Sequence, residues 1–241
     1  MPAVVGVQPG ILSAQHRGPT RADLEEGRSI AAVVYLVLSV EVDPTTLDPE
    51  HFVVSLGDGR RRRPARVLLT AASEGDENRT LILAIERPEG AEEVRPLAVT
   101  ITGPVFGEGG EVLGGLAAEI DEASRPPRLV YAVREVAEEG ACAGAPQAVR
   151  TFWSVPLDSG AALDLAAVAV TLDDSAVVHP TAVDDHGHEG GALQGDDNVV
   201  DFCVGATTPA KHVAVEGDLF RDHFGLASAA GEVAVLRAPR T

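Results

Sequence analysis

The stretch that decides the fold is "VVYLVLSVEVDPTTLDPEHFVVSLGDG", residues 33–59. It contains an apolar run, an acidic residue at Asp43, a short loop around Leu47, and a valine-rich run that ends in an acidic turn at Asp58. Val, Ile and Leu favour the pleated surface of a sheet, and Gly, Pro and Asp bound such strands. We therefore expect two β-strands here, joined by a loop with at most a single helical turn.

The same order of features returns further along the chain in "AVRTFWSVPLDSGAALDLAAVAVTLDD", residues 148–174. Three more blocks repeat in the same order. "AVVGVQPG" matches "RLVYAVRE", "DENRTLILAI" matches "DDNVVDFCVG", and "RPLAVTITGPVFGEGGEVLGGLAAEI" matches "AKHVAVEGDLFRDHFGLASAAGEVAV". An ordered series of matches at an offset of about 110–125 residues indicates an internal repeat of domain size.

Strand-like segments dominate both copies, and helical periodicity is confined to single turns at Leu47–His51, Leu163–Ala167 and Arg21–Arg28. The expected strands are Val4–Val7, Ala31–Val42, Phe52–Leu56, Ala65–Leu69, Thr80–Ile85, Ala98–Thr102, Leu116–Ile120, Leu129–Val133, Val149–Val155, Ala167–Leu172, Val177–Val183, Val199–Val204, His212–Glu216 and Glu232–Leu236.

Between the copies lies "DEASRPPR", where Pro126 and Pro127 favour an extended, stiff segment. We place a domain boundary there, with modules at residues 1–125 and 126–241. Each has the size and strand number of an antiparallel sandwich. The expected fold class is all-β, with two antiparallel immunoglobulin-like β-sandwich modules in tandem.

The chain resembles bacterial Ig-like domains of the surface-layer and adhesin type. Those modules open with a strand similar to "VVGVQPG", and "LSVEVDPTTLDPEHFVV" looks like their hallmark, of which "FWSVPLDSGAALDLAAVAV" is a looser instance. These modules commonly end in the pattern V-x-V-x-G-x-x-D-x-x-G-N-x-L. "VTITGPVFGEGGEVL" and "VAVEGDLFRDHFGLAS" are similar to that pattern but lack its Asn. The resemblance implies a sandwich used as a spacer, adhesin segment or accessory module, and it implies no catalytic residues.

Composition excludes several classes of function. A formal charge of −18 repels nucleic acid and anionic lipid, so neither is an expected partner. No apolar run reaches the roughly 18–20 residues that span a bilayer. The serines occupy no G-x-S-x-G context, and no glycine-rich phosphate loop opens a helix, so we expect no enzyme.

The segment "HPTAVDDHGHEG" gathers imidazoles and carboxylates, which suit zinc and related metals. The candidate metal ligands are His179, Asp184, Asp185, His186, His188 and Glu189. The alternative is a solvated hairpin loop, since Asp, Gly and His are ordinary turn residues. Carboxylates of "GDDN", residues 195–198, together with Asp173, Asp174, Asp184 and Asp185, are candidate calcium ligands, although no dedicated calcium-loop spacing is present.

"GRRRRPAR" is a basic cluster, Arg60–Arg63 and Arg66, on an acidic protein. It follows the "GDG" turn, so we expect it at a hairpin tip and the start of the next strand. Arginine forks there could bind a partner rich in carboxylate or sulfate. The alternative is an edge strand guarded by charge against edge-to-edge association.

Cys142 and Cys203 are the two cysteines, too few for a disulfide framework. Cys203 lies in an expected strand, where Phe202 and Val204 face the opposite way and leave Cys203 inward as a small core residue. A disulfide between the two cysteines is the other interpretation, and it would agree with an exported protein.

The leading hypothesis is a non-enzymatic tandem Ig-like protein with a binding, spacer or structural role, whose partners are proteins or surface polymers. No signal peptide is visible at Met1–Gly10, so the protein is either extracellular or on the cell surface after leader removal, or cytoplasmic. One alternative is a metal-binding accessory protein that uses the His179–His188 loop with zinc or calcium. Another is an enzyme with an unrecognised site between the modules.

Overall fold

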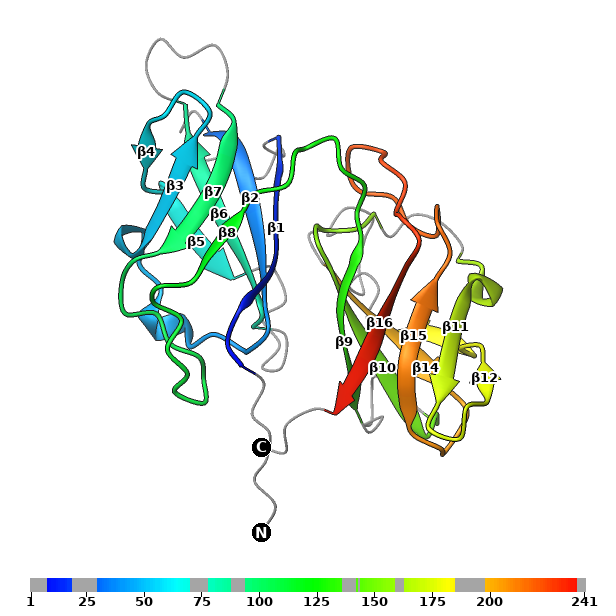
Figure 1. Cartoon of the computed structure of the whole chain (residues 1–241). Helices are drawn as coiled ribbons and strands as arrows, with labels where there is room; N and C mark the ends of the chain where they lie inside the picture. Colours follow the sequence, from blue (N-terminus) through cyan, green and yellow to red (C-terminus); the bar gives the residue numbers. More distant parts are fainter. Residues whose placement is uncertain are drawn as a thin grey trace. The chain divides into compact units, whose positions relative to one another are not determined.

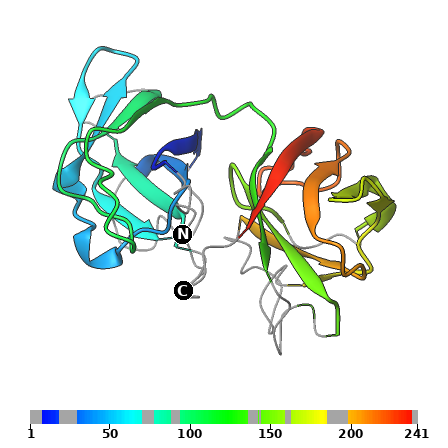
Figure 2. The same ribbon diagram turned by 60° about the horizontal axis from the view of Figure 1, so that its bottom comes forward.

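The computed structural model describes residues 8–18, 30–69, 78–87, 94–135, 142, 144–158, 163–184 and 198–237. The chain divides into two compact units, residues 1–123 and 124–241, and passes from one to the other through the green segment in Figures 1 and 2. None of the described helices is long and apolar enough to cross a membrane.

The first unit contributes two four-stranded sheets. One has the strand order β1-β2-β6-β5 and the other β4-β3-β7-β8. The strands are β1 (Ile11–Arg17), β2 (Ile30–Leu38), β3 (Phe52–Leu56), β4 (Arg61–Arg62), β5 (Arg66–Leu69), β6 (Thr80–Glu86), β7 (Pro96–Ile101) and β8 (Ala117–Glu119). All these neighbours pair antiparallel, and a single parallel bridge between Gln15 and Asp121 connects β1 to the segment after β8.

The second unit repeats this arrangement with sheets β9-β10-β14-β13 and β12-β11-β15-β16. Here the parallel contact is a true ladder between β16 and β9, so the two layers join into one eight-stranded sheet. The strands are β9 (Leu129–Glu135), β10 (Gln147–Trp153), β11 (Val168–Leu172), β12 (Val177–Val178), β13 (Ala182–Asp184), β14 (Val199–Val204), β15 (Ala210–Val215) and β16 (Gly231–Arg237).

Both strand orders are those of the immunoglobulin fold, in which strands A, B, E and D form one sheet and C′, C, F and G form the other. In each unit the first strand meets the end of the last one in parallel (Figure 1). The predicted fold class, all-β with antiparallel Ig-like sandwiches, is confirmed. Strands β1 to β8 therefore correspond in order to β9 to β16.

Alternating side chains of both sheets build the core of each unit. In β3 the buried positions are Phe52, Val54 and Leu56, and in β11 they are Val168, Val170 and Leu172. The inward residues of the opposite sheet are Leu81, Leu83 and Ile85 in the first unit, and Val200, Phe202 and Val204 in the second. A T-shaped contact of Trp153 with Phe220 closes the second core, with ring centroids 4.9 Å apart.

Short 3-10 turns precede the third strand of each unit, where the sequence predicted single helical turns. They are η1 (Pro44–Thr46) and η2 (Pro49–His51) before β3, and η3 (Leu165–Ala167) before β11. Asp48 and Asp164 cap η2 and η3 by accepting a hydrogen bond from the backbone amide two residues on. The third predicted turn, Arg21–Arg28, lies outside the described residues, as does the predicted strand Val4–Val7.

The structure corrects two details of the repeat. The counterpart of β9 is β1 at Ile11–Arg17, so the match of "AVVGVQPG" with "RLVYAVRE" was wrong. The match of "DENRTLILAI" with "DDNVVDFCVG" was wrong by one residue. It aligned Thr80 with Val200, whereas the core side chains show that Leu81 corresponds to Val200. A slip of one residue exchanges the two faces of a strand, and runs rich in Val and Leu do not reveal it.

Candidate functional site

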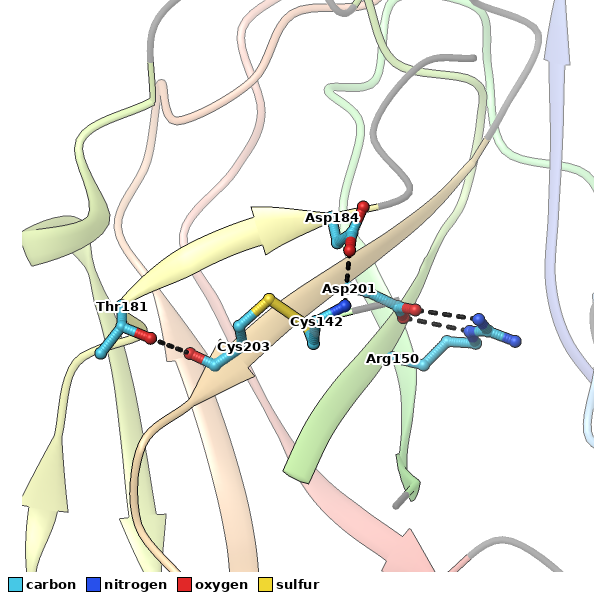
Figure 3. The surroundings of a disulfide bond; sticks show 6 residues. All are labelled: Cys142, Arg150, Thr181, Asp184, Asp201 and Cys203. Carbon is cyan, nitrogen blue, oxygen red and sulfur yellow. Dashed lines mark hydrogen bonds and ion pairs between the residues drawn. A yellow bond between two sulfur atoms is a disulfide. The ribbon is translucent and has the colours of Figure 1, made fainter. Parts of the chain in front are cut away.

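The disulfide between Cys142 and Cys203 is the feature that most distinguishes the second unit from the first (Figure 3). It joins the segment between β9 and β10 to strand β14, across 61 residues of sequence. Both cysteines are buried. Cys203 faces away from the sandwich core, which takes Phe202 and Val204 from the same strand. The prediction that Cys203 is an inward core residue was therefore wrong, and the disulfide is the interpretation that holds.

Hydrogen bonds fix the disulfide from both ends. The backbone amide of Cys142 donates to Oδ2 of Asp184, which lies at the end of β13. The carbonyl of Cys203 accepts from the backbone amide of Thr181 at 2.9 Å and from its hydroxyl at 3.3 Å. Cys142 adopts a left-handed backbone conformation, with φ of 52°. These contacts order the chain around the disulfide without leaving a reactive thiol among the described residues.

A buried ion pair lies beside the disulfide and shares strand β14 with Cys203 (Figure 3). Nε and Nη2 of Arg150 in β10 donate to Oδ1 and Oδ2 of Asp201 in β14, at 3.0 and 2.9 Å. Asp201 is fully buried and Arg150 is 4% exposed. Nη1 of Arg150 also lies 3.7 Å from Oε2 of Glu135 in β9. The guanidinium and the carboxylate thus form a bidentate ion pair through two parallel hydrogen bonds. Because Asp201 is fully buried, its carboxylate is not accessible to a substrate.

Sequence reasoning missed this pair, although a signal was present. Opposite charges interrupt two largely apolar runs, "AVRTFW" and "VVDFCV", at positions that face each other across the ladder. A charge in the middle of a buried strand requires a partner, and Arg150 and Asp201 are the two such charges in those strands.

Only two of the six predicted metal ligands, His179 and Asp184, lie in the described part of the chain. Nδ1 of His179 lies 2.7 Å from the carbonyl of Val168, to which it donates a hydrogen bond. Asp184 binds the amide of Cys142, as described above. The other four, Asp185, His186, His188 and Glu189, lie outside the described residues. Within the described residues no three side chains of His, Cys, Asp or Glu come together as a metal site.

The acidic residues predicted as calcium ligands do not converge in the part of the chain that the structure describes. Asp173 and Asp174 occupy the exposed turn between β11 and β12, where Oδ1 of Asp174 accepts from the amide of Ala176 at 3.0 Å. From the "GDDN" segment only Asn198 is described. It is buried, and its amide donates to the carbonyl of Trp153 at 2.6 Å. Asp174 therefore stabilises the turn between β11 and β12, and Asn198 stabilises the pairing of β14 with β10.

The arginine cluster lies where the sequence placed it, on the hairpin that joins β3 to β4 and along β4 itself. All four side chains from Arg60 to Arg63 are exposed. Arg60 forms an ion pair with Asp58, which raises the pKa of Arg60 and lowers that of Asp58 through their side-chain hydrogen bond. Nε of Arg63 lies 2.9 Å from Oε2 of Glu50. Arg61 and Arg62 make no ion pair with any described residue, so they are available to a partner.

Comparisons with known proteins give a weak likeness in fold. No family model and no curated protein matches the chain. Among solved structures, the N-terminal part of the bacterial S-layer protein SbsC matches 97% of this chain at 15% identity and a TM-score of 0.34. A longer SbsC structure matches 98% of this chain at 15% identity and a TM-score of 0.35. Bovine butyrophilin matches 94% of this chain at 12% identity and a TM-score of 0.22. This chain covers 45% and 26% of the two SbsC chains and 99% of the butyrophilin chain. At these TM-scores the likeness carries no argument about what the chain does.

Proposed function

We propose that this chain is a non-enzymatic tandem of two Ig-like domains with a structural, spacer or binding role outside the cytoplasm. The observation that carries the proposal is the buried disulfide between Cys142 and Cys203. Disulfides persist in oxidising compartments and are rare where glutathione keeps thiols reduced. A disulfide whose ends are tied down by Asp184 and Thr181 is a structural element, not a transient redox centre.

The buried polar groups support the non-enzymatic part of the proposal. The carboxylate of Asp201 is engaged by Arg150, and the guanidinium of Arg79 donates to the carbonyl of Ser39 and to Glu41. Each of these charges is occupied by a partner within the fold, and leaving one of them buried without its partner would be strongly destabilising. The one described histidine with a lowered pKa, His16, owes the shift mainly to burial and binds a backbone carbonyl. None of these groups combines exposure with a positioned acid–base partner.

The repeated topology supports a domain boundary close to the Pro-Pro segment, so we propose domains at residues 1–123 and 124–241. Each contains a complete pair of sheets and its own core. Pro126 and Pro127, at the start of the second domain, stiffen the backbone next to this boundary, which suits a spacer.

The test of location is the redox state of the cysteines in the cells that make the protein. Intact cells are treated with a maleimide that adds mass to each thiol, lysed under denaturing conditions without reductant, and analysed by gel shift. An exported protein shows no added mass until a reductant is supplied. Two modified thiols before reduction would contradict the proposal. Digestion by protease added outside intact cells is the companion measurement, and protection from it would also contradict export.

A further inference from the structure

We propose that the edge strand β4 is a docking site for an extended acidic peptide, which adds to the sheet as a further strand and pairs its carboxylates with Arg61 and Arg62. The inference names a partner class for the binding role proposed above, and it rests on that role.

The first support is an internal comparison between the two hairpins. The hairpin β11–β12 repeats β3–β4 in detail. In each, the last residue of the long strand, Leu56 or Leu172, donates its amide to the carbonyl four residues on, at 2.8 Å. The tips are Gly59 and Ser175, with φ of 82° and 68°. An aspartate, Asp58 or Asp174, accepts the amide two residues on in both.

The side chains of the short strands differ completely. The positions of Arg61 and Arg62 are taken by Val177 and Val178 in the second unit. Both strands are at the edge of their sheets and equally short. If this edge needed charge to fold or to resist edge-to-edge pairing, the second copy would need it as well. Since β12 does without arginine, the guanidinium groups of β4 are not required by the hairpin.

The backbone of β4 is arranged to accept another strand. In an antiparallel ladder, pairs that exchange hydrogen bonds alternate with pairs that do not. Leu56 and Arg60 are hydrogen-bonded, so the next pair, Ser55 with Arg61, is not. The amide and the carbonyl of Arg61 therefore point away from β3, towards the open edge. Main-chain groups at such an edge are the usual attachment point for an extended peptide.

The charges define the chemistry of that peptide. Arg60 and Arg63 are already paired with Asp58 and Glu50, which leaves Arg61 and Arg62 for an external anion. Successive side chains of a strand point to opposite faces, so Arg61 lies on the face of Ser55 and Arg62 on the face of Val54. An incoming strand meets both arginines only if two consecutive residues carry carboxylates. Arginine pairs with a carboxylate through two parallel hydrogen bonds, which suits this geometry.

The experiment measures fluorescence anisotropy of a labelled, capped octapeptide with two consecutive aspartates flanked by valine and threonine, titrated with the full chain. The key variant is Arg61→Val with Arg62→Val, which copies the second hairpin and so keeps a strand that the fold already accommodates. We expect about tenfold weaker binding, corresponding to two exposed charge pairs. The reciprocal variant, Val177→Arg with Val178→Arg, should raise the stoichiometry from one peptide per chain to two.

Control ligands separate strand addition from simple charge attraction. A peptide N-methylated on both aspartates keeps its charge but cannot pair with Arg61, and a peptide with one residue between the aspartates meets only one arginine. The N-methylated peptide should bind about tenfold more weakly than the parent, and the spaced peptide, which loses one charge pair, about threefold more weakly. Equal binding of either would overturn the proposal, as would unchanged affinity in the Arg61→Val, Arg62→Val variant. Tighter binding of polygalacturonate than of the peptide would replace the peptide by an acidic polysaccharide. Free thiols in the localisation test would contradict export of the protein, but they would not change the peptide affinities measured here. The two proposals can therefore fail independently.

Discussion

Arg150 and Asp201 face each other across strands β10 and β14 and form a bidentate ion pair where the first unit has Tyr35 opposite Ile82. Both ladder positions are in the centre of equivalent strands. The same fold therefore accepts a buried ion pair in one copy and an uncharged pair in the other.

The first prediction concerns this pair. Asp201→Ala leaves the guanidinium of Arg150 buried without its main counter-charge, and we expect a loss of about 3–5 kcal/mol in the free energy of unfolding. Arg150→Tyr together with Asp201→Ile copies the first unit and should cost far less, because well-packed residues often replace a buried ion pair without loss. Urea unfolding of the full chain measures both. If the double variant is as unstable as Asp201→Ala, the two copies do not share this packing.

The second prediction concerns the disulfide. Replacing Cys142 and Cys203 by serine removes a crosslink across 61 residues, which should lower the stability of the second unit by about 4 kcal/mol. Adding a reductant to the unmodified protein should reproduce this loss and should have no effect on the double variant. Unfolding followed by the fluorescence of Trp153, the one tryptophan of the chain, reports on the second unit alone. Insensitivity of that transition to reductant would show that the disulfide does not constrain the fold.

The third prediction is a pH dependence in the first unit. Burial lowers the pKa of His16, whose Nδ1 lies 3.2 Å from the carbonyl of Asp121, and the neighbouring charge of Arg17 adds to the shift. The unfolded chain then takes up a proton at higher pH than the folded chain does. Stability is complete above the ordinary histidine pKa of about 6.5 and falls as the pH drops below it. His16→Gln should remove this part of the dependence, which urea unfolding between pH 5 and 8 would detect. An unchanged pH profile in His16→Gln would assign the effect to other groups.

The fourth prediction concerns metal. Since His179 and Asp184 are engaged with main-chain groups, we expect dialysed, untagged protein to retain no stoichiometric zinc or calcium by elemental analysis. Retained metal that disappears in the variant His186→Ala with His188→Ala would instead establish the predicted loop as a metal site. A matched variant, His212→Ala, removes a half-buried histidine on β15 and controls for unspecific binding.

Much of the fold follows from sequence because strand-forming runs are local. The bounds of β3 and β14 agree with the prediction to the residue, since turn residues flank both. Strand β1 was missed because Ser13, Gln15 and Arg17 make it polar, although all three are buried. Apolar patterns do not show a strand whose polar side chains are satisfied by distant partners, such as the bond from Arg17 to the carbonyl of Ala123.

The candidate sites were less predictable, for a physical reason. The position of the arginine hairpin was correctly predicted, because a Gly-Asp-Gly turn is a local signal. The availability of Arg61, by contrast, depends on which ladder pairs are hydrogen-bonded, and the pairing of Arg150 with Asp201 depends on register. Register is a property of two strands together, and one residue of error reverses every side chain.

The central claim is that the chain holds two copies of one Ig-like domain, each with its own core. Val54 and Val170 occupy the same position in β3 and β11, and both are fully buried. Val54→Ala and Val170→Ala should each cost about 2 kcal/mol. Hydrogen exchange of the intact chain, resolved by mass spectrometry, shows which residues lose protection when the stability is lowered. Two domains predict faster exchange throughout residues 1–123 for Val54→Ala and throughout residues 124–241 for Val170→Ala, with the other half unchanged. Acceleration across the whole chain in both variants would contradict the claim.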